Sequence, residues 1–315
     1  LITAGGAIFA AWPAVYAAAF SGFYFAMLLV LFALFFRPVG FDYRSKLGDA
    51  RWRNAWDWGL FVGGAVPSLV FGVAFGNLIL GVPFHLDELL RPYYTGSFWA
   101  LLNPFALLAG VVSFSLLTMH GGIWLQMRTA GDIAERTRQW ITWMGLAAMA
   151  AFALAGMWLV MGIDGYRIVE QPALDALPNP LGKTVEIAAG AWLSNYSAYP
   201  VTMVFPLLGF AGMALTILLS RANKAGWGFV SSSLGITGVI MTAGISMFPF
   251  VMPSSTHPGH SFTIWDASSS HLTLTVMFWA TVIFLPIVLG YTIWNYRKMW
   301  GKLTVEDIQD RFSAY

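Results

Sequence analysis

The chain contains no cysteine, and only 10% of its 315 residues are charged. The absence of cysteine excludes a disulfide framework, a thiolate nucleophile and a thiolate-ligated metal or iron–sulfur site. The scarcity of charge excludes an ordinary soluble domain, in which about 25% of residues are charged. Since 58% of the residues are hydrophobic, and the short alternating segments typical of barrel strands are not seen, the composition predicts an all-α polytopic membrane protein.

Long apolar runs without charge predict the positions of the membrane spans. About 20 apolar residues are needed to cross the hydrocarbon core of a bilayer as a helix. The first residue, Leu1, already lies in an apolar stretch, so we expect a chain whose N-terminus was lost inside a helix and whose residues 1–11 are a remnant. Seven complete spans are predicted near residues 17–36, 58–82, 104–127, 140–162, 200–220, 227–252 and 272–296.

Lysine and arginine are concentrated in alternate loops. Of the 17 basic residues, 14 lie in one set of loops, at residues 37–57, 128–139, 221–226 and 297–315. The opposite set contains only Arg91, Arg167 and Lys183. By the positive-inside rule, the first set and the C-terminal tail are predicted to be cytoplasmic.

The basic loop at residues 37–57 also contains aromatic residues. Such a mixture suits either anionic lipid headgroups or a nucleic acid. Because the loop joins two predicted membrane spans, we favour membrane lipid as the partner and expect no nucleic acid.

The most polar stretch of the chain, MFPFVMPSSTHPGHSFTIWDASSSHLTL, runs from Met247 to Leu274. It is predicted to form an outside loop between the last two spans. Asp266, or one of the serines at 268–270, is expected to cap the last helix, since a side-chain oxygen can accept from free backbone N–H groups there. Trp265 is expected at the membrane interface, where aromatic residues are enriched.

This stretch contains residue types that suit two kinds of chemistry. His257 and His260 have H-x-x-H spacing, and Asp266 and His271 follow, which is a set of ligands that zinc accepts. The intervening proline and glycine favour a turn over a helical face, so we favour a solvated loop over a metal site. A serine nucleophile with a histidine base is the other alternative, but the chain has no G-x-S-x-G elbow to support it.

Few polar residues lie within the predicted spans. His120 is a candidate haem ligand or proton relay, although one histidine cannot supply both ligands of a six-coordinate haem, and we favour a bond to a neighbouring helix or to headgroups. Asn77 and Asn103 lie near span ends, where helix-to-helix bonding or capping is expected. No charged residue lies in the middle of a predicted span, which weakens the alternative of a secondary transporter or channel.

Several segments together resemble one known family. They are FFRPVGFDYRSK, RWRNAWDWGLF, GVAFGNLILGVPF, LLNPFALLAGVVS, GMWLVMGIDGY and MFPFVMPSST…WDASSSHLTLTVM. In these segments, which occur in family order, the chain resembles subunit II of cytochrome bd ubiquinol oxidases over essentially its whole length.

The resemblance implies a subunit of a terminal oxidase in the bacterial inner membrane, which oxidises quinol, reduces dioxygen to water and generates a proton-motive force. Two b-type haems and one d-type haem are then expected in the partner, subunit I, and none in this chain. A structural quinone and small accessory membrane subunits are also implied. The family fold has nine spans in two four-helix bundles with one extra helix. This chain would be a single transmembrane domain, residues 1–315, without the first helix and most of the second.

The resemblance implies no catalytic, cofactor-binding or metal-binding residue in this chain. The candidates for structural roles are Trp265 and Asp266, which are expected to shape the outer turn, together with Asn77 and His120. A transporter or channel is the alternative function, and a haem-carrying membrane cytochrome based on His120 is a third.

Overall fold

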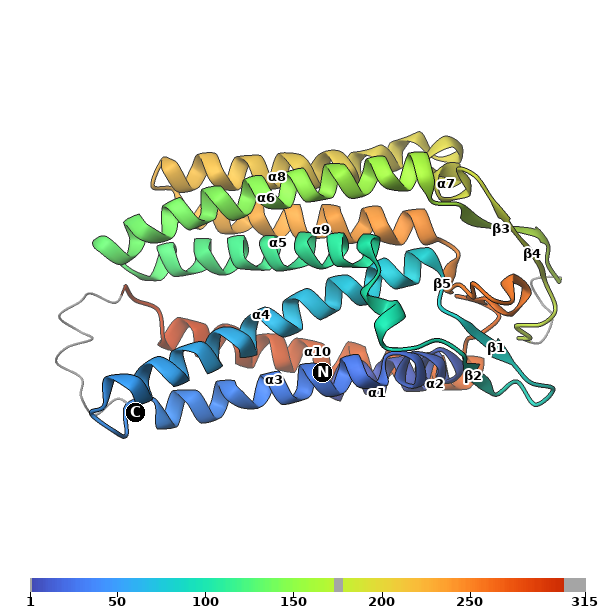
Figure 1. Ribbon diagram of the computed structural model, residues 1–315, viewed down its shortest axis with the longest axis horizontal. Helices are drawn as coiled ribbons and strands as arrows, with labels where there is room; N and C mark the ends of the chain where they lie inside the picture. Colours follow the sequence, from blue (N-terminus) through green and yellow to red (C-terminus); the bar gives the residue numbers. More distant parts are fainter. Residues whose placement is uncertain (1, 173–177, 303–315) are drawn as a thin grey trace.

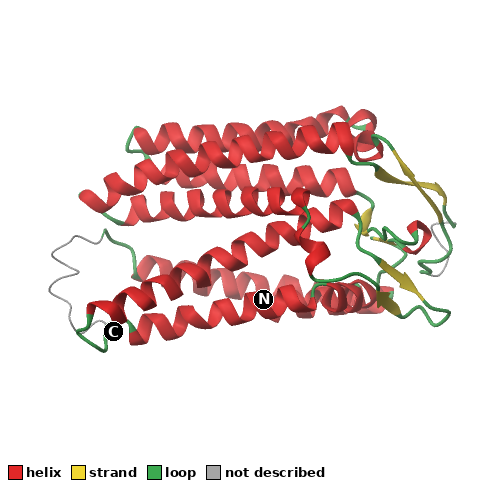
Figure 2. Cartoon of the chain, in the orientation of Figure 1, coloured by secondary structure: helices red, strands yellow, loops and turns green. Residues whose placement is uncertain are grey.

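The computed structural model describes residues 2–172 and 178–302. Within these residues the chain is mainly helical, with small hairpins gathered at one end (Figures 1 and 2). Seven helices are long and apolar enough to cross a membrane, which confirms the predicted all-α polytopic fold. These spans are α3 (Tyr24–Tyr43), α4 (Ala50–Leu80), α5 (Pro104–Arg128), α6 (Asp132–Gly162), η3 with α8 (Pro200–Met203 and Val204–Arg221), α9 (Ala225–Met247) and α10 (His271–Lys298).

The first span lies further along the chain than predicted. Two short helices, α1 (Ile2–Ala11) and α2 (Pro13–Gly22), precede it, and α3 continues past Arg37 to Tyr43. The prediction near residues 17–36 was therefore displaced, because it ended the span at the first charged residue. Long basic side chains can extend toward the headgroups while their backbone stays helical, so most of the predicted loop at residues 37–57 is helix.

Four helices, α5, α6, α8 and α9, pack against one another as one group (Figure 1). Met119, Ile123, Ile141 and Met213 are completely buried between them. Helix α4 packs on α5 and on α3, so it joins this group to the N-terminal part of the chain. The nine-helix arrangement in two bundles stays a prediction.

Helix α10 differs from the other spans, because none of its residues is buried by the part of the chain that the structure describes. It is attached at both ends. Before it, the backbone N–H of Ser269 donates to the carbonyl of Ala11 at 2.8 Å. After it, the guanidinium of Arg128 lies 4.8 Å from the ring centroid of Trp300. Most of the surface of α10 is therefore free to contact lipid or a partner helix.

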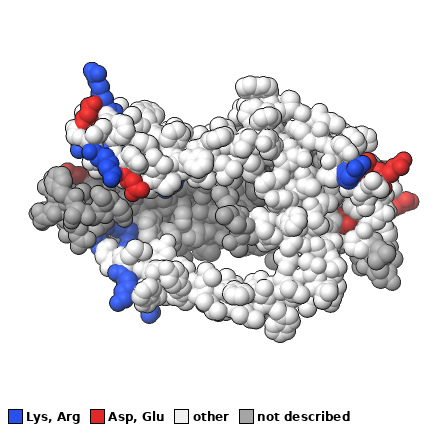
Figure 3. All heavy atoms as spheres, turned by 90° about the horizontal axis from the view of Figure 1, so that it is seen from below, with Lys and Arg blue, Asp and Glu red and all other residues white. Residues whose placement is uncertain are grey.

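Connections between spans alternate between two ends of the molecule (Figure 1). At one end, called here the basic end, lie the links between α3 and α4, α5 and α6, and α8 and α9, together with residues 297–302. The predicted alternation of loops is thus confirmed, and the rest of the predicted C-terminal tail lies outside the described residues. On the face shown in Figure 3, charged side chains gather near the two ends and leave the middle free.

The opposite end, called here the hairpin end, contains three two-stranded antiparallel sheets among the described residues. It also holds the short helices η1 (Trp99–Leu102), η2 (Ala191–Leu193), α7 (Ser194–Ala198) and η4 (Pro258–His260). The paired strands are β1 (Phe84–Leu86) with β2 (Pro92–Tyr94), β3 (Gly165–Glu170) with β4 (Thr184–Ala188), and β5 (Phe250–Met252) with β6 (Phe262–Thr263).

Candidate functional site

The polar stretch after α9 forms the packed interior of the hairpin end. Ser254, Ser261 and Thr263 have no exposed surface. The backbone N–H of Ser254 donates to the hydroxyl of Ser261 at 2.9 Å, and the hydroxyls of Ser254 and Thr256 donate to the carbonyl of Phe84 on β1. The expectation of a solvated loop was wrong for Ser254, Ser261 and Thr263, whose hydroxyls bond within the fold and can therefore be buried. It holds for residues 255–257, which are exposed.

A buried ion pair joins two of the hairpins. The Nζ of Lys183, just before β4, lies 2.7 Å from the Oδ2 of Asp266, and their side chains are 2% and 11% exposed. Lys183 also donates to the carbonyl of Pro180 at 2.7 Å, and Asp266 Oδ1 accepts from the backbone N–H of Thr263 at 2.8 Å. Burial lowers the pKa of Lys183, and the negative charge of Asp266 opposes that shift.

The polar stretch also begins the last span. The N-cap of α10 is Ser270, whose hydroxyl accepts from the backbone N–H of Thr273 at 3.3 Å, so one of the predicted capping serines has this role and Asp266 does not. Trp265 is 38% exposed. Its ring contacts Phe248 edge to face, with 5.8 Å between the ring centroids.

Asn77 lies at the junction of α4, η1 and α5. It is buried, and its Nδ2 donates to the carbonyls of Val73 and Leu101, both at 2.8 Å. Its Oδ1 accepts from the amide of Asn103 at 2.9 Å, and Asn103 in turn caps α5 by accepting from the N–H of Ala106 at 2.8 Å. The structure thus shows the predicted helix-to-helix bonding and capping by the two asparagines.

His120 lies within the four-helix group. Its Nδ1 is 2.8 Å from the hydroxyl of Ser232 on α9, and its ring stacks on Phe229 at a centroid distance of 4.7 Å. This is the predicted bond to a neighbouring helix. In the described part of the chain, no group of three or more histidine, aspartate or glutamate residues is arranged to hold a metal ion.

Sequence reasoning missed the role of Lys183. The three basic residues of the hairpin end each have a carboxylate partner: Arg91 with Asp87 at 2.7 Å, Arg167 with Glu186 at 3.5 Å, and Lys183 with Asp266. Only the last pair is buried. The sequence shows that Lys183 is a rare basic residue on this side, but it contains no local signal that names Asp266 as its partner.

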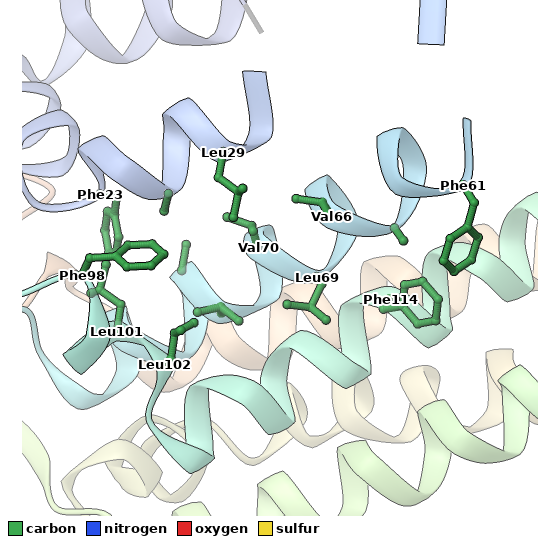
Figure 4. Close-up of a pocket in the computed structure, with 14 residues that line it drawn as sticks. Phe23, Leu29, Phe61, Val66, Leu69, Val70, Phe98, Leu101, Leu102 and Phe114 are labelled. Atoms are coloured by element: carbon green, nitrogen blue, oxygen red, sulfur yellow. The ribbon is translucent and has the colours of Figure 1, made fainter. Parts of the chain in front are cut away.

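An apolar cavity of about 380 Å³ opens between α3, α4, η1 and α5 (Figure 4). Phe23, Leu29, Phe61 and Leu102 contribute to its wall, together with small residues such as Ala74. All 14 lining side chains are alanine, valine, leucine or phenylalanine. The cavity can therefore accept a hydrocarbon chain, but its side chains offer no hydrogen bond to a polar head.

Comparison with known families agrees with this architecture. The model of the family described as cytochrome bd terminal oxidase subunit II matches residues 1–299. The chain belongs to this family. As a cytochrome bd subunit II, it is a multi-pass membrane protein of an oxidoreductase complex, which implies haems and a subunit I in that complex.

Curated bacterial relatives of this subunit II cover most of its length. It is 58% identical to cytochrome bd-I ubiquinol oxidase subunit 2 of Escherichia coli (strain K12) over 98% of this chain and 82% of the relative. It is 52% identical to a probable cytochrome oxidase subunit 2 of Haemophilus influenzae, over 100% of this chain and 83% of that one. The subunit 2 of the Bacillus subtilis oxidase is 31% identical over 94% and 78% of the two chains.

A solved structure shows the same fold. The bd oxidase from Geobacillus thermodenitrificans matches with a TM-score of 0.59 and 12% sequence identity, over 88% of this chain and 74% of the other. The family and these relatives are oxidase subunits, so the alternative function of a secondary transporter or channel is not supported.

Proposed function

We propose that this subunit II carries no haem itself and stabilises the haem-bearing subunit I. Quinol oxidation, dioxygen reduction and generation of a proton-motive force then belong to the assembled complex, with two b-type haems and one d-type haem in subunit I. The basic end is proposed to face the cytoplasm of a bacterium whose inner membrane contains the complex. We also propose small accessory membrane subunits as partners.

The position of His120 is the observation that carries this proposal. It is the one histidine in the interior of a described span, so the described spans cannot supply a pair of histidine ligands to a haem. The other four histidines lie at the hairpin end or at the first residue of α10. A stabilising role also agrees with α10, because its surface is not covered by this chain and is available to helices of subunit I.

A reduced-minus-oxidised absorption spectrum tests the absence of haem. The protein is purified in mild detergent with and without subunit I. We expect haem bands only in the preparation that contains the partner. Haem bands from this chain alone would contradict the proposal, and the variant His120→Gln would then show if His120 is the ligand.

We also propose that the cavity in Figure 4 holds the isoprenoid tail of a structural quinone. Its lining of apolar side chains supports a hydrocarbon ligand, whereas the quinone ring would have to bind outside the cavity. Each methylene group that is buried contributes about 0.8 kcal/mol. Loss of the contacts of only two methylene groups therefore lowers the affinity of the chain for the quinone about tenfold.

Filling the cavity is expected to remove the quinone. In Ala74→Phe a ring would occupy the space, so we expect about tenfold less quinone per haem after extraction of the purified complex and chromatography. Ala55→Phe is the matched control, because Ala55 is exposed on the same helix and does not line the cavity. Equal quinone content in the two variants, or a phospholipid chain lost in place of quinone, would argue against this ligand.

A further inference from the structure

Three histidines that are distant in the sequence meet at the hairpin end. His85 lies on β1, while His257 and His260 lie at η4. The ring centroids of His257 and His260 are 5.0 Å apart, and those of His85 and His257 are 5.5 Å apart. His85 also stacks on Tyr93 at 5.7 Å. Three titratable rings therefore meet where the β1–β2 hairpin contacts the segment at residues 250–263, one from the hairpin and two from the segment.

One hydrogen bond connects these two segments through a histidine ring. The backbone N–H of Leu86 donates to Nδ1 of His260 at 2.9 Å. To accept this bond, Nδ1 must carry a lone pair, so His260 is neutral with its proton on Nε2. A protonated ring has a donor at both nitrogens. When His260 is protonated, it therefore cannot accept the hydrogen bond from the Leu86 N–H.

The charges around His260 favour its neutral form. Burial lowers the pKa of His260, and the positive charges of His257, His85 and Lys183 lower it further. Three carboxylates at this end of the described chain already have cationic partners. Those pairs are Asp266 with Lys183, Glu186 on the adjacent β4 with Arg167, and Asp87 between β1 and β2 with Arg91.

We propose that the contact between His260 and Leu86 is a pH-sensitive latch. It fixes the Leu86 end of β1 on the segment at residues 250–263, beside the bonds of Ser254 and Thr256 to Phe84, and it frees the Leu86 N–H when His260 is protonated. With the basic end in the cytoplasm, as proposed above, the latch lies on the side that a proton-motive oxidase acidifies. The oxidase would then loosen its own outer surface as protons accumulate there.

The direction of the pH effect follows from proton linkage. In the released form, His260 binds a proton with an ordinary pKa of about 6.5. In the latched form it does not, because its Nδ1 accepts the hydrogen bond from the Leu86 N–H. Released chains therefore bind more protons, and the latch is stable above about pH 6.5 and weakens as the pH falls. At about pH 5.5, one unit below the ordinary pKa, the released fraction is expected to be about tenfold higher.

Hydrogen exchange of the complex with subunit I, reconstituted in lipid nanodiscs, tests the latch. The protection factor of the Leu86 amide is measured at pH 7.5 and pH 5.5 and corrected for the intrinsic effect of pH on exchange. We expect it to fall about tenfold at the lower pH. An unchanged protection factor in the wild-type complex would overturn the proposal without any variant.

A variant separates His260 from the other histidines. In His260→Asn the side-chain oxygen can accept from Leu86 at any pH, so the fall in protection is expected to disappear. His257→Asn is the matched control, in which His260 remains and most of the fall should persist. If protection falls in His260→Asn as much as in the wild type, another group controls the hairpin and the latch is refuted.

Discussion

Replacement of Asp266 by alanine is expected to destabilise the subunit by about 3–5 kcal/mol, because the change leaves the ammonium group of Lys183 buried without its counter-charge. Lys183 is 2% exposed, and within the described residues its one other hydrogen bond is to the carbonyl of Pro180. The yield of assembled complex and its thermal midpoint measure the loss. Haem spectra of the complex that still assembles should be unaltered.

Two controls distinguish the buried charge from a loss of packing. The double variant Lys183→Met with Asp266→Leu removes both charges and is expected to be more stable than Asp266→Ala. Arg167→Ala breaks the neighbouring ion pair with Glu186, whose side chains are 61% and 56% exposed, and should cost at most about 1 kcal/mol. Altered haem spectra with normal assembly in Asp266→Ala would show that the pair acts on the haem site and is not structural.

The second large effect is expected where α8 and α9 touch through their backbones. A Cβ atom on Gly238 would lie 2.3 Å from the backbone nitrogen of Gly209 and 2.7 Å from the carbonyl oxygen of Phe205. Because neither is a side-chain atom that can rotate away, Gly238→Ala must separate the helices. We expect a loss of about 1–3 kcal/mol or more, measured as a lower thermal midpoint of the complex.

Gly244 provides the matched control on the same helix, since a Cβ atom there would meet nothing within 4 Å. Alanine has a higher helix propensity than glycine, so Gly244→Ala should leave stability unchanged or raise it by about 0.5–1 kcal/mol. Equal midpoints for Gly238→Ala and Gly244→Ala would mean that α8 and α9 have space to adjust.

The contacts of the two asparagines show how far local reasoning reaches. A polar side chain near the end of an apolar run has few satisfactory environments in a membrane, so helix bonding or capping was predictable for Asn77 and Asn103. The carbonyl of Leu101 as an acceptor for Asn77 was not predictable, because it depends on where η1 returns against α4. The same distinction applies to His120, whose bond to a neighbouring helix was predicted without its partner Ser232.

Predictions failed where a local signal was read as a boundary or as exposure. Arg37 was read as the end of a span, although α3 continues to Tyr43, because the side chain can reach polar surroundings without ending the helix. Ser254 and Ser261 were read as part of a solvated loop, although they are buried. Their hydroxyls bond to backbone groups of folded segments, and the sequence alone does not show which backbone groups will be adjacent.

By itself, the sequence determined the membrane class, the number of complete spans, the alternation of their connections and the family resemblance, because each depends on composition, on apolar runs or on short motifs. Only the tertiary structure decided that Lys183 meets Asp266 and that His260 accepts from Leu86, 174 positions away in the chain. The physical reason is that a buried polar group needs a partner, but the partner is supplied by the packing of distant segments and not by neighbouring residues.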